Sequence, residues 1–229
     1  MEKMMLSPRL ACLAALVPNG ARLADVGTDH GKLPIALLRE GRIAAAIASD
    51  ISEGPLAHAA QNAWEHGVSL SLRLAADLDA VTPEECDTVS IAGMGGETIA
   101  EILSAAPWTT AGAHLLLLQP MTMVYELRQW LWANGYQIAR ETLCREERRQ
   151  YVVLSVRGGA PKRTVPLPRC AVSEALCRAP GAAAYLEMLL HREETALYGM
   201  EKSRSADETR LWAQRSLVEE LRRAWEDCI

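Results

Sequence analysis

The spacing of apolar and polar positions changes at regular intervals along residues 1–157 of this chain. Short apolar runs typical of strands lie at 23–26, 43–49, 69–75, 87–92, 114–119, 136–143 and 151–157. Other stretches have apolar residues three and four positions apart, which predicts helices at about 8–17, 32–41, 55–66, 97–103 and 123–133. Only a charged turn separates the last two strand-like runs, so we expect them to form a hairpin.

Strands that alternate with helices usually form a mostly parallel sheet with helices on both faces. The first five strand-like runs follow this alternation, whereas the final hairpin requires an antiparallel strand near one edge. The sequence therefore predicts an α/β fold with a doubly wound, Rossmann-like sheet of seven strands.

The composition changes at Gly158, where a linker rich in glycine and proline begins and the strand pattern ends. Two long helical stretches follow, at 181–202 and 206–228. We therefore expect two domains, a Rossmann-like domain at 1–160 and a C-terminal helical domain at 161–229.

The second of these helical stretches has its own start signal and its own packing seam. Ser205 with Glu208 three residues later forms a capping-box pattern. The apolar positions every seven residues, which predict a coiled-coil-like antiparallel hairpin, are Leu211, Val218 and Trp225. From residue 161 onward the chain has 11 basic and 11 acidic residues, which favours a solvated docking arm over a catalytic unit.

The composition limits the classes of protein that this chain can belong to. It has 229 residues, of which 49% are hydrophobic and 23% charged, enough for a core of its own. No apolar run approaches the roughly 20 residues of a membrane span, and no signal peptide pattern opens the chain, so we expect a cytoplasmic protein without a membrane partner. The six cysteines are scattered without metal-ligand spacing, so we expect no metal site.

A glycine turn follows the first predicted strand and reads Asp25-x-Gly27-x-Asp29-x-Gly31. The two glycines permit a tight turn and close approach of a ligand, and the helix that follows presents free N–H groups. Two carboxylates would repel the pyrophosphate of a dinucleotide, but they suit a ligand with an ammonium group and a sulfonium. S-adenosylmethionine is such a ligand, and the turn resembles motif I of the Rossmann-like methyltransferases. An ordinary strand-to-helix turn is the alternative interpretation.

Polar or glycine-rich residues end the other predicted parallel strands, at the sheet edge where ligands of open α/β sheets bind. Asp50 is placed to accept hydrogen bonds from ribose hydroxyls, and Asp77 to meet the adenine amino group. The residues that we expect to bind the cofactor are Asp25, Gly27, Asp29, His30, Gly31, Asp50, Ile51, Ala76, Asp77, Leu78, Gly93 and Met94. An NAD-dependent oxidoreductase fits less well, because it requires a three-glycine turn and a second domain with a proton donor.

The fourth strand ends in Gly93-Met94-Gly95-Gly96 rather than in the Asn/Asp-Pro-Pro-aromatic clamp of many methylases that act on exocyclic amines. Together with other segments it carries a specific resemblance to the TrmK family of tRNA (adenine-22, N1) methyltransferases. These segments read LSPRL at 6–10, DVGTDHGKLPIALL at 25–38, IAGMGGETIAEIL at 91–103 and LLLLQP at 115–120. The resemblance implies a class I methyltransferase with a seven-stranded sheet and a helical arm.

The resemblance also implies methyl transfer to N1 of an adenine in the D-arm region of tRNA. N1 lies on the pairing edge, so the base must be unpaired and swung into the pocket. Asp29 is the candidate to stabilise the developing ring cation or take the amino proton, with His30 a weaker one, although Asp29 could instead hold the methionine ammonium. Gln119 could read the adenine edge or serve only as a hydrogen bonder at the strand end. Methylation of another RNA or a small molecule, and non-catalytic binding of S-adenosylmethionine, stay open.

The net charge of −5 gives no global signature for nucleic acid, but its distribution does. Residues 140–169 include eight basic and three acidic side chains, which predicts a phosphate-facing strip, although a solvated hairpin would have the same composition. The residues that we expect to contact the tRNA substrate are Arg9, Gly95, Gln119, Pro120, Arg148 and Arg149. We expect a monomer or a weak dimer.

Overall fold

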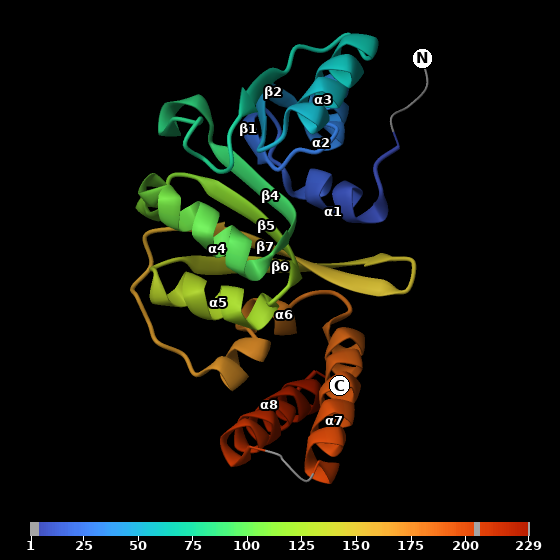
Figure 1. Ribbon diagram of the computed structural model, residues 1–229, viewed down its shortest axis with the longest axis vertical. Helices are drawn as coiled ribbons and strands as arrows, with labels where there is room; N and C mark the ends of the chain where they lie inside the picture. The colour runs from blue at the N-terminus through green and yellow to red at the C-terminus, as the bar shows by residue number, and fades with distance from the viewer. Residues whose placement is uncertain (1–4, 204–206, 229) are drawn as a thin grey trace.

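Seven strands form one sheet in the order β3-β2-β1-β4-β5-β7-β6 in the computed structural model, which describes residues 5–203 and 207–228 (Figure 1). The strands span Ala21–Val26 (β1), Ile43–Asp50 (β2), Ser71–Leu74 (β3), Thr88–Gly95 (β4), Leu115–Thr122 (β5), Gln137–Glu146 (β6) and Arg149–Arg157 (β7). β1 to β5 are parallel, whereas β7 runs antiparallel to β5 and to the edge strand β6. The predicted sheet, with its antiparallel strand near one edge, is confirmed.

The predicted helices are also present among the described residues. They span Pro8–Leu16 (α1), Lys32–Arg39 (α2), Glu53–Glu65 (α3), Gly96–Ala105 (α4), Val124–Ala133 (α5), Ala182–Lys202 (α7) and Glu208–Glu226 (α8). The sequence did not predict four short elements, Pro83–Glu85 (η1), Pro107–Ala111 (η2), Leu167–Ala171 (η3) and Glu174–Cys177 (α6). The last two lie in the segment that we expected to be a linker.

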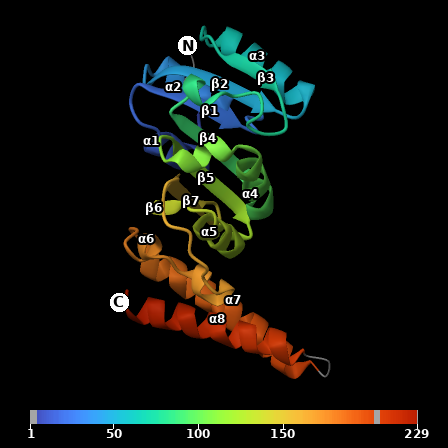
Figure 2. The ribbon, with the colours of Figure 1, turned by 90° about the vertical axis from the view of Figure 1, so that its left-hand side faces the viewer.

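The helices cover both faces of the sheet, so each strand contributes alternate side chains to two cores (Figure 2). Leu116 and Leu118 join the core beneath α4 and α5. Leu117, between them in sequence, joins the core beneath α1 and α2. All three leucines are 0% exposed, so β5 contributes buried side chains to the cores on both faces of the sheet.

The tips of β4 and β5 differ from our expectation. We expected the strands to end before Gly93 and at Gln119, but β4 continues through Gly95 and β5 through Thr122. The pairing between the two strands shifts around Gly93, whose φ of 79° lies in the left-handed region that glycine adopts readily. The glycine-rich tip is therefore an irregular end of a paired strand rather than a free turn.

The arm is an antiparallel pair of helices, α7 and α8, which lie side by side (Figure 2). Of the predicted heptad positions in α8, Val218 is buried, while Leu211 and Trp225 are half-buried. Asp207 caps α8, since its carboxylate accepts hydrogen bonds from the N–H groups of the first turn. The predicted cap, Ser205, lies outside the described residues.

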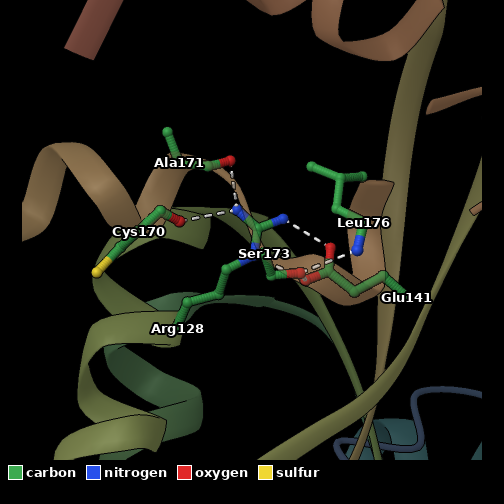
Figure 3. Close-up of polar contacts among 6 residues, drawn as sticks. All are labelled: Arg128, Glu141, Cys170, Ala171, Ser173 and Leu176. Atoms are coloured by element: carbon green, nitrogen blue, oxygen red, sulfur yellow. Dashed lines mark hydrogen bonds and ion pairs between the residues drawn. The ribbon is translucent and has the colours of Figure 1, made fainter. Parts of the chain in front are cut away.

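A buried ion pair connects the sheet domain to the segment that leads to the arm (Figure 3). Arg128 of α5 and Glu141 of β6 have fully buried side chains, and their nearest charged atoms lie 2.7 Å apart. Arg128 also donates to the backbone oxygens of Cys170 and Ala171 at 3.0 and 2.9 Å. Ser173 donates to Glu141 at 2.5 Å. The segment 167–177 is thus packed into the sheet domain.

Candidate functional site

The glycine turn between β1 and α2 has a backbone that few side chains tolerate. Gly27, Asp29 and Gly31 have φ values of 68°, 55° and 68°, all in the left-handed region. A Cβ at Gly31 would press on Ala59, whereas one at Gly27 would meet only the flexible end of the Met94 side chain. At Gly27 it is therefore the backbone conformation that favours glycine, and aspartate is among the few other residues that adopt this conformation readily.

Asp25 is the buried carboxylate of this turn, with 6% of its surface exposed. Burial raises its pKa from 3.8 to about 6, although a hydrogen bond from Thr28 opposes the shift. The Thr28 hydroxyl donates to the carboxylate at 2.7 Å. Within the described residues no cation pairs with Asp25, so a cationic ligand at this point would favour its charged form.

The acids at the ends of β2 and β3 bond to backbone N–H groups. One carboxylate oxygen of Asp50 accepts from the Asp29 N–H at 3.4 Å and the other from the Ser52 N–H at 3.0 Å. Asp77 accepts from the Asp79 N–H at 2.8 Å. These bonds fix the orientation of both carboxylates at the sheet edge.

The neighbours of these acids differ in what they can offer a ligand. Ile51 is 72% exposed, so its apolar face is open to a flat ring. Leu78 is 1% exposed and packs in the core, so only its backbone can meet a ligand. Ala76 is exposed beside Asp77.

Asp29 holds its carboxylate in solvent, with its side chain 71% exposed. Its ionisable neighbour is the His30 ring, whose Nε2 lies 3.3 Å from the carboxylate. The His30 ring in turn lies 4.9 Å from the His58 ring. Asp29 and Asp25 therefore sit in one turn but in opposite environments.

Gln119 is fully buried, and both ends of its amide are used inside the protein. Its Oε1 accepts from the Arg9 guanidinium at 2.7 Å and from the Gly93 N–H at 3.2 Å. Its Nε2 donates to the backbone oxygen of Pro120 at 2.9 Å. Arg9 also lies 3.8 Å from Glu146 of β6. Four of the predicted site residues thus meet at the tips of β4 and β5, namely Arg9, Gly93, Gln119 and Pro120. The sequence did not indicate that Glu146 lies beside them.

Arg148 and Arg149 lie at the turn of the β6–β7 hairpin, which extends beyond the rest of the sheet (Figure 1). Both are exposed. Together with Pro120 they line one groove, so the structure connects the predicted phosphate contacts to the strand tip. Gly95 lies nearby in β4, where it pairs with Thr122.

Two classes of feature are absent from the part of the chain that the structure describes. None of its helices is both long and apolar enough to cross a membrane. No three His, Cys, Asp or Glu side chains gather where they could hold a metal ion.

Comparisons with known proteins agree with this geometry. The Methyltransferase domain family matches residues 6–154. The tRNA (adenine(22)-N(1))-methyltransferase of Bacillus subtilis is 35% identical over 161 residues, which cover 69% of this chain and 68% of that protein. The chain belongs to the TrmK family. The predicted class I methyltransferase fold and family are therefore confirmed.

Solved structures of TrmK proteins extend the match to the arm. The B. subtilis m1A22 tRNA methyltransferase TrmK superposes with a TM-score of 0.84 at 26% identity, covering 97% of this chain and 99% of that one. The Streptococcus pneumoniae protein Sp1610, solved in complex with S-adenosyl-L-methionine, superposes with a TM-score of 0.82 at 30% identity, covering 96% and 100%. The helical pair is thus a shared part of the TrmK fold.

Proposed function

We propose that this chain transfers a methyl group from S-adenosylmethionine to N1 of adenine 22 in tRNA. The glycine turn carries the proposal, because it combines backbone N–H groups and close approach with a buried carboxylate that lacks a cationic partner among the described residues. Membership of the TrmK family and the relatives' reactions support the choice of substrate.

The residues present fit S-adenosylmethionine. We assign Asp25 to the cationic end of the cofactor, Asp50 to the ribose hydroxyls and Asp77 to the adenine amino group. The exposed Ile51 offers an apolar face to the adenine ring, and Gly27 and Gly31 admit the methionine portion. The flexible thioether of Met94 lies over Gly27 and would move aside. When bound, the cofactor supplies an activated methyl group on a sulfonium sulfur.

The chain must hold an unpaired adenine with N1 aligned toward that methyl group. Extruding a base costs roughly a few kcal/mol, and alignment is the main catalytic contribution that the protein can make. Methylation leaves a cationic ring, and the exposed carboxylate of Asp29 is free to approach it and accept a proton from the amino group. His30, 3.3 Å from Asp29, is placed to relay that proton.

Gln119 has a positioning role in this proposal. Its amide already bonds Arg9, the Gly93 N–H and the Pro120 oxygen, and through these bonds it holds the strand tips that frame the base site. Direct reading of the adenine edge by Gln119 stays a prediction. The backbone of Gly93 and Met94 is a second candidate for that contact.

Incubation with labelled S-adenosylmethionine and unmodified tRNA, followed by nucleoside analysis, tests the proposal. We expect label in 1-methyladenosine, and none when the same tRNA carries guanine at position 22. Label in a different nucleoside would move the activity to another substrate. Cofactor binding without transfer to any RNA would indicate a binding module.

A further inference from the structure

A groove of about 650 Å³ lies between the β6–β7 hairpin, the start of α5 and the first half of α7. Its lining includes Pro120, Met121 and Thr122, so the groove reaches the end of β5, the strand that also carries Gln119. Its size lies within the roughly 300–1,000 Å³ typical of ligand pockets. We call it the hairpin groove.

The rim of the hairpin groove is cationic. Arg148 and Arg149 contribute from the hairpin turn and Arg192 from α7. Arg148 and Arg149 make no ion pair within the described residues, so their charge is available to a ligand. Arg192 bonds the Tyr125 hydroxyl at 3.0 Å and is partly neutralised by Glu193 at 2.6 Å.

Three arginines of the arm beyond the groove are paired with acids. Arg215 pairs with Glu201 at 2.8 Å, and Arg222 pairs with Glu194 at 2.5 Å. Arg223 lies 3.3 Å from Glu219 in its own helix. A polyanion would have to displace these acids on the arm, whereas on the hairpin it meets unpaired guanidinium groups.

The interior of the hairpin groove is apolar and partly aromatic. Tyr185 and Leu189 are 5% and 2% exposed and form part of its wall. Met188 is 38% exposed on the same helix, and Met121 and Met123 are exposed at the β5 end. Flat apolar and aromatic surfaces beside arginines suit nucleotides, whose bases stack while their phosphates bind cations. Glu126 is the only acid that lines the groove within the described residues.

We infer that the hairpin groove binds the unpaired RNA nucleotides next to the target adenine, with their phosphates on Arg148, Arg149 and Arg192 and their bases toward the apolar wall. This inference rests on the proposed function, because it places the RNA strand that must reach the strand tips. It also explains the attachment of α7, since one side of the groove belongs to the arm and the other to the hairpin. An acidic protein could also bind these arginines. An acidic protein, however, would not require a groove that reaches the end of β5, whereas an RNA strand leading to the target adenine would.

Salt-dependent binding tests the cationic rim. Affinity for tRNA should be measured by filter binding across a salt series for the parent, the Arg148→Ala/Arg149→Ala double variant and Arg192→Ala. Each lost phosphate contact on a single strand lowers the slope of log affinity against log salt by roughly 0.7, so we expect the double variant to lose about 1.4 and Arg192→Ala about 0.7. Arg215→Ala, which removes a paired arginine of the arm, is the control and should leave the slope unchanged.

A charge placed inside the groove tests the apolar wall. Met188→Glu should weaken tRNA binding roughly tenfold or more, because it replaces part of the apolar wall that faces the bases with a carboxylate, whose charge also repels the nearby phosphates. Tyr198→Glu makes the same charge change on an exposed position of α7 outside the groove and should change binding less than twofold. Calorimetry with S-adenosylmethionine should give parent affinity for every variant.

The outcomes separate this inference from the proposed function. If the parent forms 1-methyladenosine but the double variant keeps the parent slope, the groove assignment is wrong and the activity stands. If the parent methylates no RNA but the arginine variants still flatten the slope of RNA binding, the proposed reaction fails and the groove remains an RNA site. Equal losses for Met188→Glu and Tyr198→Glu would overturn the placement of the RNA in the groove.

Discussion

The backbone of Asp29 has a φ of 55°, a left-handed conformation that glycine adopts more readily than other residues. Its N–H donates to Asp50, whereas its carboxylate stands in solvent beside His30. In the proposed function, the backbone of Asp29 therefore supports the cofactor site, and its exposed side chain has a separate task. We assign the cationic end of the cofactor to Asp25, which is buried in the same turn.

We predict that Asp29→Asn slows single-turnover methyl transfer roughly 100-fold, in the range of general-base contributions, while cofactor affinity changes less than about threefold. Asparagine also tolerates the left-handed backbone, so the fold is kept. Rapid-quench assays at saturating cofactor and calorimetry give the two quantities. A large loss of affinity with an unchanged rate would instead assign Asp29 to the methionine ammonium.

Burial of Asp25 affects the stability of the fold as well as the proposed cofactor site. Its pKa of about 6 in the folded protein, against 3.8 for an ordinary Asp, means that the folded state binds more protons between these pH values. The free energy of unfolding therefore falls as pH rises through this window, and the cost of the buried charge is complete above about pH 6. The cost follows from burial, so a neutral isostere should relieve it.

We predict that Asp25→Asn raises the free energy of unfolding at pH 8 by roughly 1–3 kcal/mol, since one pKa unit corresponds to about 1.4 kcal/mol. At pH 4 the gain should be nearly lost, because Asp25 is then protonated in the parent. Urea unfolding at both pH values measures this difference. The same variant should bind S-adenosylmethionine more weakly, and equal stability at pH 4 and pH 8 would contradict the shifted pKa.

At the scale of elements, periodicity predicted every strand and the long helices, because each buries one continuous face. The sequence missed η3 and α6, which have five and four residues and are too short to show a period. It also missed contacts between distant segments. Nothing in the sequence around Arg128 and Glu141 indicates that residues 167–177 cover them. The strand-tip acids were predictable because a parallel sheet places successive carboxyl ends at one edge.

We predict a large asymmetry in how the Arg128–Glu141 pair responds to substitution. Arg128→Met should lower the free energy of unfolding by roughly 3–5 kcal/mol, because it leaves Glu141 charged and buried. The double variant Arg128→Met/Glu141→Leu should lose clearly less, since it removes both charges. Urea unfolding of the two variants, with Arg178→Met at an exposed ion pair as control, provides the comparison. Equal losses in the single and double variants would mean that the pair itself stabilises the fold.

At the scale of the whole molecule, contacts that cross residue 160 bear on the expected domain boundary. Arg163 donates its N–H to the Trp132 oxygen at 3.0 Å and stacks its guanidinium over the Trp132 ring. Gln129 donates to the Val165 oxygen at 2.8 Å. These bonds, together with those of Arg128, hold residues 163–173 against α5. We therefore propose that the sheet domain ends after α6 and that α7 and α8 alone form the arm.

Two fragments test this boundary. Fragment 1–160 removes the oxygens of Cys170 and Ala171 that accept from the buried Arg128, and it removes the Ser173 hydroxyl that donates to Glu141. Fragment 1–180 keeps all of them. A hydrogen bond to a charged group contributes about 1.5–3 kcal/mol, so we expect fragment 1–160 to be at least about 3 kcal/mol less stable in urea. Fragments of equal stability would place the boundary at 160.

Neither fragment should reach the stability of the full chain, because α7 covers part of the sheet domain. Tyr185, Leu186 and Leu189 of α7 belong to a cluster that includes Tyr125 and Leu143. Both fragments expose this apolar surface, and both remove Arg192 from the hairpin groove. Fragment 1–180 should therefore bind S-adenosylmethionine as the parent does in calorimetry but bind tRNA more weakly. Parent-like tRNA affinity in fragment 1–180 would mean that the arm contributes nothing to RNA binding.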